Sequence, residues 1–191
     1  MKNKLATKRS LAYISVSKRA FLRLKFIIKN MEIGIISDSH DHVDNIKKAV
    51  QIFKDRKIDL VFHLGDYVAP SSVRLFKGVK VIGIFGNNDG EQFRVTKAFG
   101  EIDGEIKEDF CEINKDYVKF ALYHGKWPEI TEALLKCGKY DVVLYGHDHN
   151  KLQKKVGKTI SLNPGTAHGF GKKCTIAIFD TKSKKAEFVE L

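Results

Sequence analysis

The stretch IGIISDSH, residues 33–40, joins an apolar run of strand-forming residues to a polar end that carries Asp38 and His40. Four later stretches repeat this plan: LVFHLGD at 60–66, VIGIFGN at 81–87, VKFALYH at 118–124 and DVVLYGHDH at 141–149. Short apolar runs of this kind predict buried strands, and ligands of α/β proteins bind at the carboxyl ends of strands. We therefore expect the polar residues at these strand ends to converge on one rim. They are Asp38, His40, Asp66, Asn87, His124, His147 and His149.

Seven nitrogen and oxygen donors exceed what one metal ion takes from a protein, but two ions that share a carboxylate would use them all. Asp66, with one oxygen for each ion, is the natural bridge. Imidazole, carboxylate and amide ligands without a thiolate suit divalent Mn, Ni, Co, Fe or Zn rather than a structural zinc site. The sequence therefore predicts a catalytic centre with two divalent metal ions, with Mn or Ni favoured.

At this point the chain resembles the calcineurin-like metallophosphoesterases, in particular their small single-domain phosphodiesterase branch. The signature blocks appear as Asp38-Ser39-His40, Gly65-Asp66-Tyr67, Gly86-Asn87-Asn88-Asp89, His124-Gly125 and Gly146-His147-Asp148-His149. The resemblance extends over residues 31–191. It implies an α/β fold, a four-layer α/β/β/α sandwich with two mixed β-sheets flanked by helices.

The resemblance also implies roles for individual residues. One ion would be held by Asp38, His40, Asp66 and His149, and the other by Asp66, Asn87, His124 and His147. The implied catalytic residues are Asp66, Asn87, Asn88 and His124. A hydroxide bridging the two ions would attack phosphorus. The resemblance therefore predicts a metal-dependent phosphoesterase, with a phosphodiesterase favoured. Its substrate would be a small phosphodiester or phosphomonoester.

Two positions depart from the wider family. Many of its phosphatases have histidine after the asparagine ligand, where this chain has Asn88, and an amide cannot supply a proton near neutral pH. The phosphodiesterase branch often continues His-Gly-His, where this chain has Lys126. We expect Asn88, Lys126 and His42 to contact substrate, with solvent exposure as the alternative for Lys126 and a helix start for His42. His168 is expected on a loop, beside the pocket or away from it.

Residues 1–30 form a basic extension with nine lysines and arginines and no acidic residue. This arm has three interpretations: translation that starts at Met31 or an arm without a catalytic role, a targeting segment, and a membrane-surface helix. Residues 31–191 hold 25 basic and 23 acidic residues, a net charge of +2, so most of the chain's charge of +11 lies in the extension. The charge is therefore weak support for nucleic-acid binding by the catalytic domain. We expect one domain over residues 31–191 and a cytoplasmic protein without a transmembrane segment, and the sequence leaves homo-oligomerisation open.

Apolar spacing predicts helices over 43–56, 71–76, 91–99 and 129–137, between the strands named above. Hairpins are predicted from 106–113 with 117–123, from 151–156 with 159–163 and from 175–179 with 186–189.

Two other functions fit the same pattern. One is a non-catalytic protein-binding scaffold, since the fold resembles a retromer subunit that has lost ligands, although this chain retains all seven. The other is a nuclease, which the nearly neutral domain and the absence of interleaved aromatic and basic residues disfavour.

Overall fold

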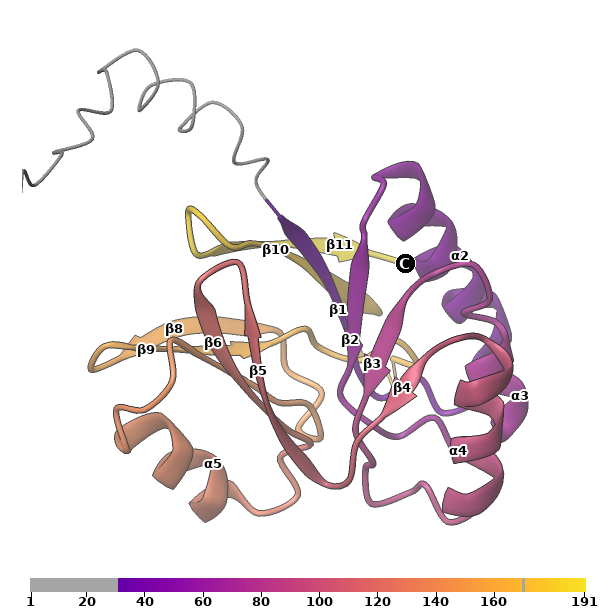
Figure 1. Ribbon diagram of the computed structural model, residues 1–191, viewed down its shortest axis with the longest axis horizontal. Coiled ribbons are helices and arrows are strands. Elements are labelled where there is room, and N and C mark those ends of the chain that lie inside the picture. The colour runs from indigo at the N-terminus through magenta and orange to yellow at the C-terminus, as the bar shows by residue number, and fades with distance from the viewer. Residues whose placement is uncertain (1–30, 170) are drawn as a thin grey trace, which may run out of the picture.

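The computed structural model describes residues 31–169 and 171–191, so the predictions for residues 1–30 fall outside the described residues. Two mixed β-sheets form the centre of the described chain (Figure 1). The first has the order β11-β10-β1-β2-β3-β4, and the second has the order β5-β6-β7-β9-β8.

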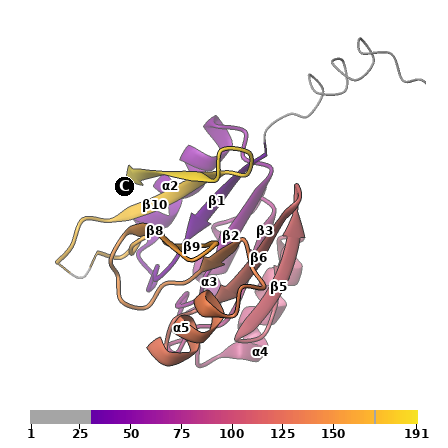
Figure 2. The ribbon, with the colours of Figure 1, turned by 90° about the vertical axis from the view of Figure 1, so that its left-hand side faces the viewer.

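Apolar runs form the parallel strands β1 to β3 of the first sheet, and the two-residue strand β4 pairs in parallel with β3. The antiparallel hairpin of β10 and β11 pairs with β1 through β10 (Figure 2). The strands are β1 (Glu32–Ile36), β2 (Leu60–His63), β3 (Val81–Gly83), β4 (Glu105–Ile106), β10 (Thr175–Asp180) and β11 (Lys185–Glu190).

The second sheet has β6, β7 and β9 in parallel, with β5 and β8 antiparallel at its edges. Its strands are β5 (Phe110–Lys115), β6 (Val118–Tyr123), β7 (Val142–Leu144), β8 (Leu152–Val156) and β9 (Thr159–Asn163).

Helices cover the outer face of each sheet (Figure 1). They are α2 (Val43–Asp55), α3 (Pro70–Arg74), α4 (Gln92–Glu101) and α5 (Pro128–Lys136). Phe53 of α2, Val73 of α3 and Phe99 of α4 lie in one buried core, and Leu135 of α5 packs in another with residues of the second sheet. The core between the sheets includes Phe62, whose ring centroid lies 5.5 Å from that of Phe120. The four-layer α/β/β/α prediction is confirmed.

One predicted hairpin strand was wrong. The run 106–113 is divided between the sheets, because Ile106 pairs with Gly83 of β3 in the first sheet and Phe110 begins β5 in the second. Its composition contains no signal for this change of sheet, which depends on which strand edges are open. The predicted helices are confirmed to within two residues at either end, and no helix in the described ranges is long and apolar enough to cross a membrane.

Candidate metal centre

The predicted ligands follow strands of both sheets. Asp38 and His40 follow β1, Asp66 follows β2 and Asn87 follows β3. In the second sheet, His124 follows β6, and the loop from β7 to β8 carries His147 and His149. The site therefore lies where the strand ends of the two sheets meet.

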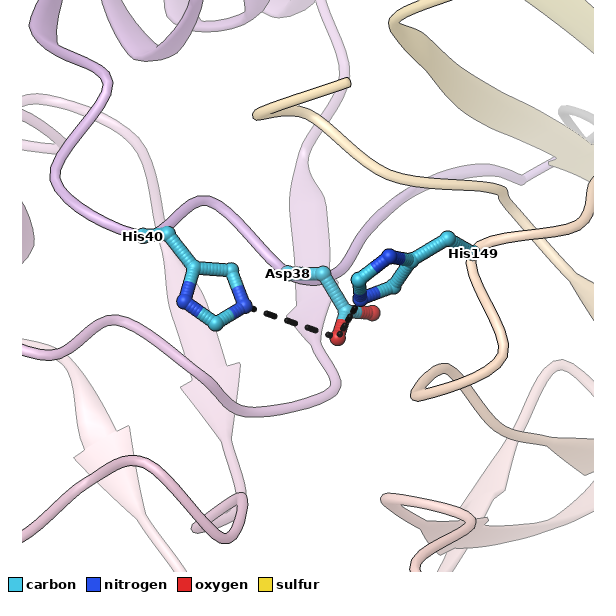
Figure 3. A group of neighbouring side chains, drawn as sticks. All are labelled: Asp38, His40 and His149. Carbon is cyan, nitrogen blue, oxygen red and sulfur yellow. Dashed lines mark ion pairs between the residues drawn. The ribbon is translucent and has the colours of Figure 1, made fainter. Parts of the chain in front are cut away.

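Two carboxylates and three imidazoles meet there. Asp38 Oδ1 lies 3.2 Å from His149 Nε2 and 4.0 Å from His40 Nε2. Figure 3 shows ring nitrogens of His40 and His149 directed at this one oxygen. Asp66 Oδ2 lies 3.3 Å from His40 Nε2 and 3.4 Å from His124 Nε2. Two groups of three residues bring potential ligand atoms within 4.8 Å of one another: Asp38, His40 and His149, and Asp38, Asp66 and His124.

The His124 ring is held in one orientation by the protein backbone. Its Nδ1 lies 2.7 Å from the carbonyl oxygen of Leu64, and since a carbonyl can only accept, Nδ1 carries the proton. Nε2 is therefore directed toward Asp66. Burial opposes the charged imidazole, but the hydrogen bond and charge of Asp66 outweigh it and raise the pKa of His124. The charged imidazole carries a second proton on Nε2, and a metal ion bound at Nε2 would have to displace that second proton.

Asp66 is held by Asn88. The backbone N–H of Asn88 donates to Asp66 Oδ1 at 2.9 Å, and its side-chain amide donates to Oδ2 at 2.8 Å. Burial would raise the pKa of the Asp66 carboxyl, but hydrogen bonds from His124 and His40 and the Asn88 N–H outweigh it, so this pKa lies below its ordinary value. The carboxylate is therefore ionised and available to a cation.

The remaining two predicted ligands lie beside this group. The His147 ring centroid is 5.2 Å from that of His124, and the His147 N–H donates to Asp38 Oδ2 at 3.1 Å. Burial and the nearby charge of His124 lower the pKa of His147, which favours the neutral, ligating imidazole. Asn87 and His124 line the same pocket.

Backbone strain is concentrated at these positions. Positive φ angles, which L-residues seldom adopt, occur at five of the predicted ligands. These are Asp38 (52°), His40 (37°), Asp66 (60°), His147 (68°) and His149 (59°). Strained residues of this kind gather at functional sites, where the surrounding structure holds them in place.

The site also leaves buried polar atoms without a hydrogen bond of regular geometry. Asp38 Oδ1 and His124 Nε2 are buried, and their contacts with His149 at 3.2 Å and with Asp66 at 3.4 Å are too poorly aligned to satisfy them within the described ranges. Such atoms are costly in a folded protein and are usually explained by an ion or a catalytic role. Carboxylate oxygen and imidazole nitrogen are ligands of divalent transition metals. The residues present therefore fit a divalent metal ion.

Residues 31–184 match the calcineurin-like phosphoesterase superfamily domain. The chain belongs to the calcineurin-like phosphoesterase superfamily. This membership confirms the predicted family and the predicted class of enzyme, a hydrolase of phosphate esters, and implies divalent metal ions at the site.

Relatives agree with this assignment. A phosphodiesterase from Methanocaldococcus jannaschii is 38% identical over 159 residues, which are 81% of this chain and 96% of that protein. The structure of an archaeal phosphodiesterase superposes with a TM-score of 0.80 at 37% identity, covering 84% of this chain and all of that one. At 16% identity, vacuolar protein sorting 29 from Cryptosporidium parvum shares the fold alone, with a TM-score of 0.53 and coverage of 85% and 97%.

The other residues singled out from the sequence lie near the candidate metal centre of this phosphoesterase. His42 accepts a hydrogen bond from the Asn45 N–H at the start of α2, and its ring centroid lies 5.5 Å from that of His168. His168 in turn lies 5.9 Å from the His40 ring. Lys126 lines the pocket that contains His124.

Two residues that matter at the site of this phosphoesterase had no predicted role. Asp89 accepts four backbone N–H groups, from Asp66, Tyr67, Val68 and Gly86, at 2.7–2.9 Å, and so ties the loops after β2 and β3 together. Trp127 lines the same pocket as Lys126. Its sequence signal was available, because the only tryptophan of the chain comes three residues after a predicted ligand.

Proposed function

We propose that this chain is a metal-dependent phosphodiesterase. The observation that carries the proposal is the convergence of Asp38 and Asp66 with the imidazoles of His40, His124 and His149, at 3.2–4.0 Å, where strands of both sheets end. The M. jannaschii relative, 38% identical over nearly its whole length, is a phosphodiesterase. Within the superfamily, this likeness favours a diester substrate.

Two sets of residues would hold two divalent ions. Asp38, His40, Asp66 and His149 form the first set; Asp66, Asn87, His124 and His147 form the second. The position of Asp66 Oδ2, 3.3 Å from His40 of the first set and 3.4 Å from His124 of the second, supports Asp66 as the shared ligand. The donor set favours Mn or Ni, with Co, Fe and Zn as further choices. When bound, two such ions lower the pKa of water to give a nucleophile and neutralise phosphoryl charge.

The chain's own residues prepare the site for this chemistry. Asn88 holds both oxygens of Asp66, and the carbonyl of Leu64 fixes the His124 ring, so the principal ligands are oriented before substrate arrives. The side chains proposed to bind substrate are Asn88, Lys126 and His42. Lys126 lines the pocket beside Asn87 and His124, where its ammonium would attract a phosphate ester.

The full ligand set argues against a non-catalytic scaffold, because a scaffold gains nothing from keeping seven potential ligands, five of them in strained backbone conformations. We assign catalysis to residues 31–191, which include all seven, and place the protein in the cytoplasm. The three cysteines, Cys111, Cys137 and Cys174, are all free thiols, which suits a reducing compartment. The proposed substrates are small phosphodiesters, with phosphomonoesters as weaker ones.

The experiment is hydrolysis by the metal-stripped full-length protein of phosphodiesters, phosphomonoesters, cyclic nucleotides and single-stranded DNA, with Mn, Ni, Co, Zn and Mg added in turn. We expect diester hydrolysis that requires added metal and about two bound ions per chain by elemental analysis. Undiminished turnover in excess chelator would refute the metal-dependent mechanism. Preferential cleavage of DNA would favour a nuclease.

A pair of carboxylate-to-amide substitutions tests the shared ligand. Loss of a residue that only supports a metal ligand costs about 10- to 100-fold in metal affinity or activity. Asp66 is proposed as a ligand of both ions, so Asp66→Asn should lower kcat/KM by more than about 100-fold and reduce the amount of bound metal. Asp148→Asn is the matched control in the loop between β7 and β8, because an amide oxygen can still accept from Asn150 and Asn163. Equal activity of the two variants would remove Asp66 from the metal centre.

A further inference from the structure

A pocket of about 450 Å³ opens beside the candidate metal centre. This volume is typical of a site for a small molecule. Asn87 and His124 line it together with apolar and aromatic side chains, those of Phe85, Tyr123, Trp127 and Ile130. A phosphate bound at the metal centre would therefore have an apolar, aromatic surface next to it.

Trp127 presents the largest aromatic surface of this pocket. Its side chain is 56% exposed, although large aromatic residues are usually well buried. Its backbone is fixed, because its N–H donates to the Tyr123 hydroxyl at 3.1 Å and its carbonyl accepts from Ile130 and Thr131 in the first turn of α5. An exposed indole on a rigid support is suited to stacking against a flat ligand, since little conformational entropy is lost on binding.

Lys126 adds a positive charge next to this indole. Its Nζ lies 5.5 Å from the centroid of the Trp127 ring, and no ion pair of Lys126 is found within the described part of the chain. The combination of a cation and an aromatic face suits a ligand that is both anionic and aromatic. A purely aliphatic phosphodiester would use only the cation.

The remaining lining of the pocket is polar. Gln92, the first residue of α4, and Asp109 are both exposed there. An amide and a carboxylate can hydrogen-bond to the edge of a nucleobase, as such side chains do in nucleic-acid recognition. A pocket of about 450 Å³ has room for a single nucleotide, not for a folded polymer.

From these observations we infer that the pocket selects phosphodiesters that carry a nucleoside. The base stacks on the exposed face of Trp127, and the phosphate occupies the end of the pocket lined by Asn87 and His124. Lys126 lies beside the stacked base and attracts the anionic ligand. The inference rests on the proposed phosphodiesterase function and specifies its substrate class.

Binding can be measured without turnover, because Trp127 is the only tryptophan in the chain. Thymidine monophosphate should quench the tryptophan fluorescence of the metal-stripped full-length protein in a saturable way. Deoxyribose phosphate, which has the same phosphate and sugar but no base, should leave it unchanged. Equal quenching by the two ligands, or quenching by neither, would overturn the inference.

The kinetic test compares two esters with the same leaving group, thymidine monophosphate p-nitrophenyl ester and methyl p-nitrophenyl phosphate, with Mn²⁺ present. Trp127→Ala should lower the ratio of their kcat/KM values by about 5- to 150-fold, the range expected for loss of one base–aromatic stack. Trp127→Phe should retain most of the ratio. Phe93→Ala removes an aromatic side chain that is 84% exposed and does not line the pocket, and should leave the ratio unchanged.

An unchanged ratio in Trp127→Ala would overturn the inference while leaving the phosphodiesterase function intact. If neither ester is hydrolysed but quenching still requires the base, the proposed function fails and the nucleoside site stands. The bound metal content and the urea unfolding curve of each variant show whether it is folded. If Trp127→Ala is misfolded, the kcat/KM ratio of Trp127→Phe decides the result: it should stay close to that of the natural protein, and a ratio as low as that of Trp127→Ala would overturn the inference.

Discussion

Acid should destabilise this protein through His63, a completely buried histidine at the end of β2. Its Nδ1 accepts the Gly65 N–H at 3.3 Å, so its proton lies on Nε2, which is 3.1 Å from the Ser39 hydroxyl. The rings of Tyr67 and Phe76 pack against it at 4.0 and 5.6 Å between centroids. A second proton would face the Gly65 N–H in apolar surroundings, and burial lowers the pKa of His63 to about 3 from 6.5.

The magnitude follows from proton linkage. Below pH 6.5 the unfolded chain takes up a proton at this imidazole that the folded protein does not, so the free energy of unfolding falls as the pH falls. The loss is complete near pH 3, where the folded imidazole is protonated as well. At about 1.4 kcal/mol per pH unit, the loss is about 5 kcal/mol over the whole range and about 2 to 3 kcal/mol between pH 7 and pH 4.5.

Urea unfolding of the metal-stripped protein at pH 7 and pH 4.5 measures this loss. Carboxylates also titrate, so the informative comparison is with His63→Asn, whose side-chain oxygen can accept the Gly65 N–H but does not titrate in this range. The variant should be less stable at pH 7, yet lose about 2 to 3 kcal/mol less than the natural protein on acidification. Equal losses in the two proteins would refute the assignment of a buried, neutral His63.

Three further predictions concern the site and the extension. In Gly86→Ala the new Cβ would clash with Asp66 Oδ1, so we expect at least about a 100-fold loss of kcat/KM. Gly100→Ala is the matched control: a Cβ there meets nothing within 4 Å, so this substitution should raise the free energy of unfolding by about 0.5–1 kcal/mol. Asn88→His should raise turnover of alkyl diesters relative to aryl diesters by up to about 10²-fold if metal content is retained, and an unchanged ratio would exclude proton donation from this position. A chain that begins at Met31 should keep the kcat and KM of the full-length protein, since all predicted ligands lie after it; inactivity of the shortened chain would assign residues 1–30 to the fold or the site.

Much of the candidate site could be predicted because the relevant signals are local. An apolar run that ends in a ligand-type residue indicates both a strand and the position of its end, and this predicted β1, β2, β3, β6 and β7. The order of the ligands in five such runs was sufficient for the family and for the four-layer fold, both of which were confirmed. Helix boundaries were also local, as with Pro128, whose fixed φ suits the first turn of α5.

Other features depend on contacts between distant segments and have no local signal. The run 106–113 was predicted as one strand, but Ile106 and Phe110 belong to different sheets, because pairing depends on which strand edges are open in the assembled fold. Likewise, the hydrogen bonds from four backbone N–H groups to Asp89 exist only when the loops after β2 and β3 lie side by side.

By itself, then, the sequence determined which residues stand at the strand ends, and with them the donor groups of a candidate divalent metal centre. Only the tertiary structure decided which ligands meet: Asp38 of the first sheet lies 3.2 Å from His149 of the second, across 111 residues of chain. It also placed Asn87 and Gln92 in one pocket with His124 and Trp127, which lie more than 30 residues later in the chain. The physical reason is that strand propensity follows from neighbours along the chain, whereas coordination geometry and pocket shape follow from how two sheets pack against each other.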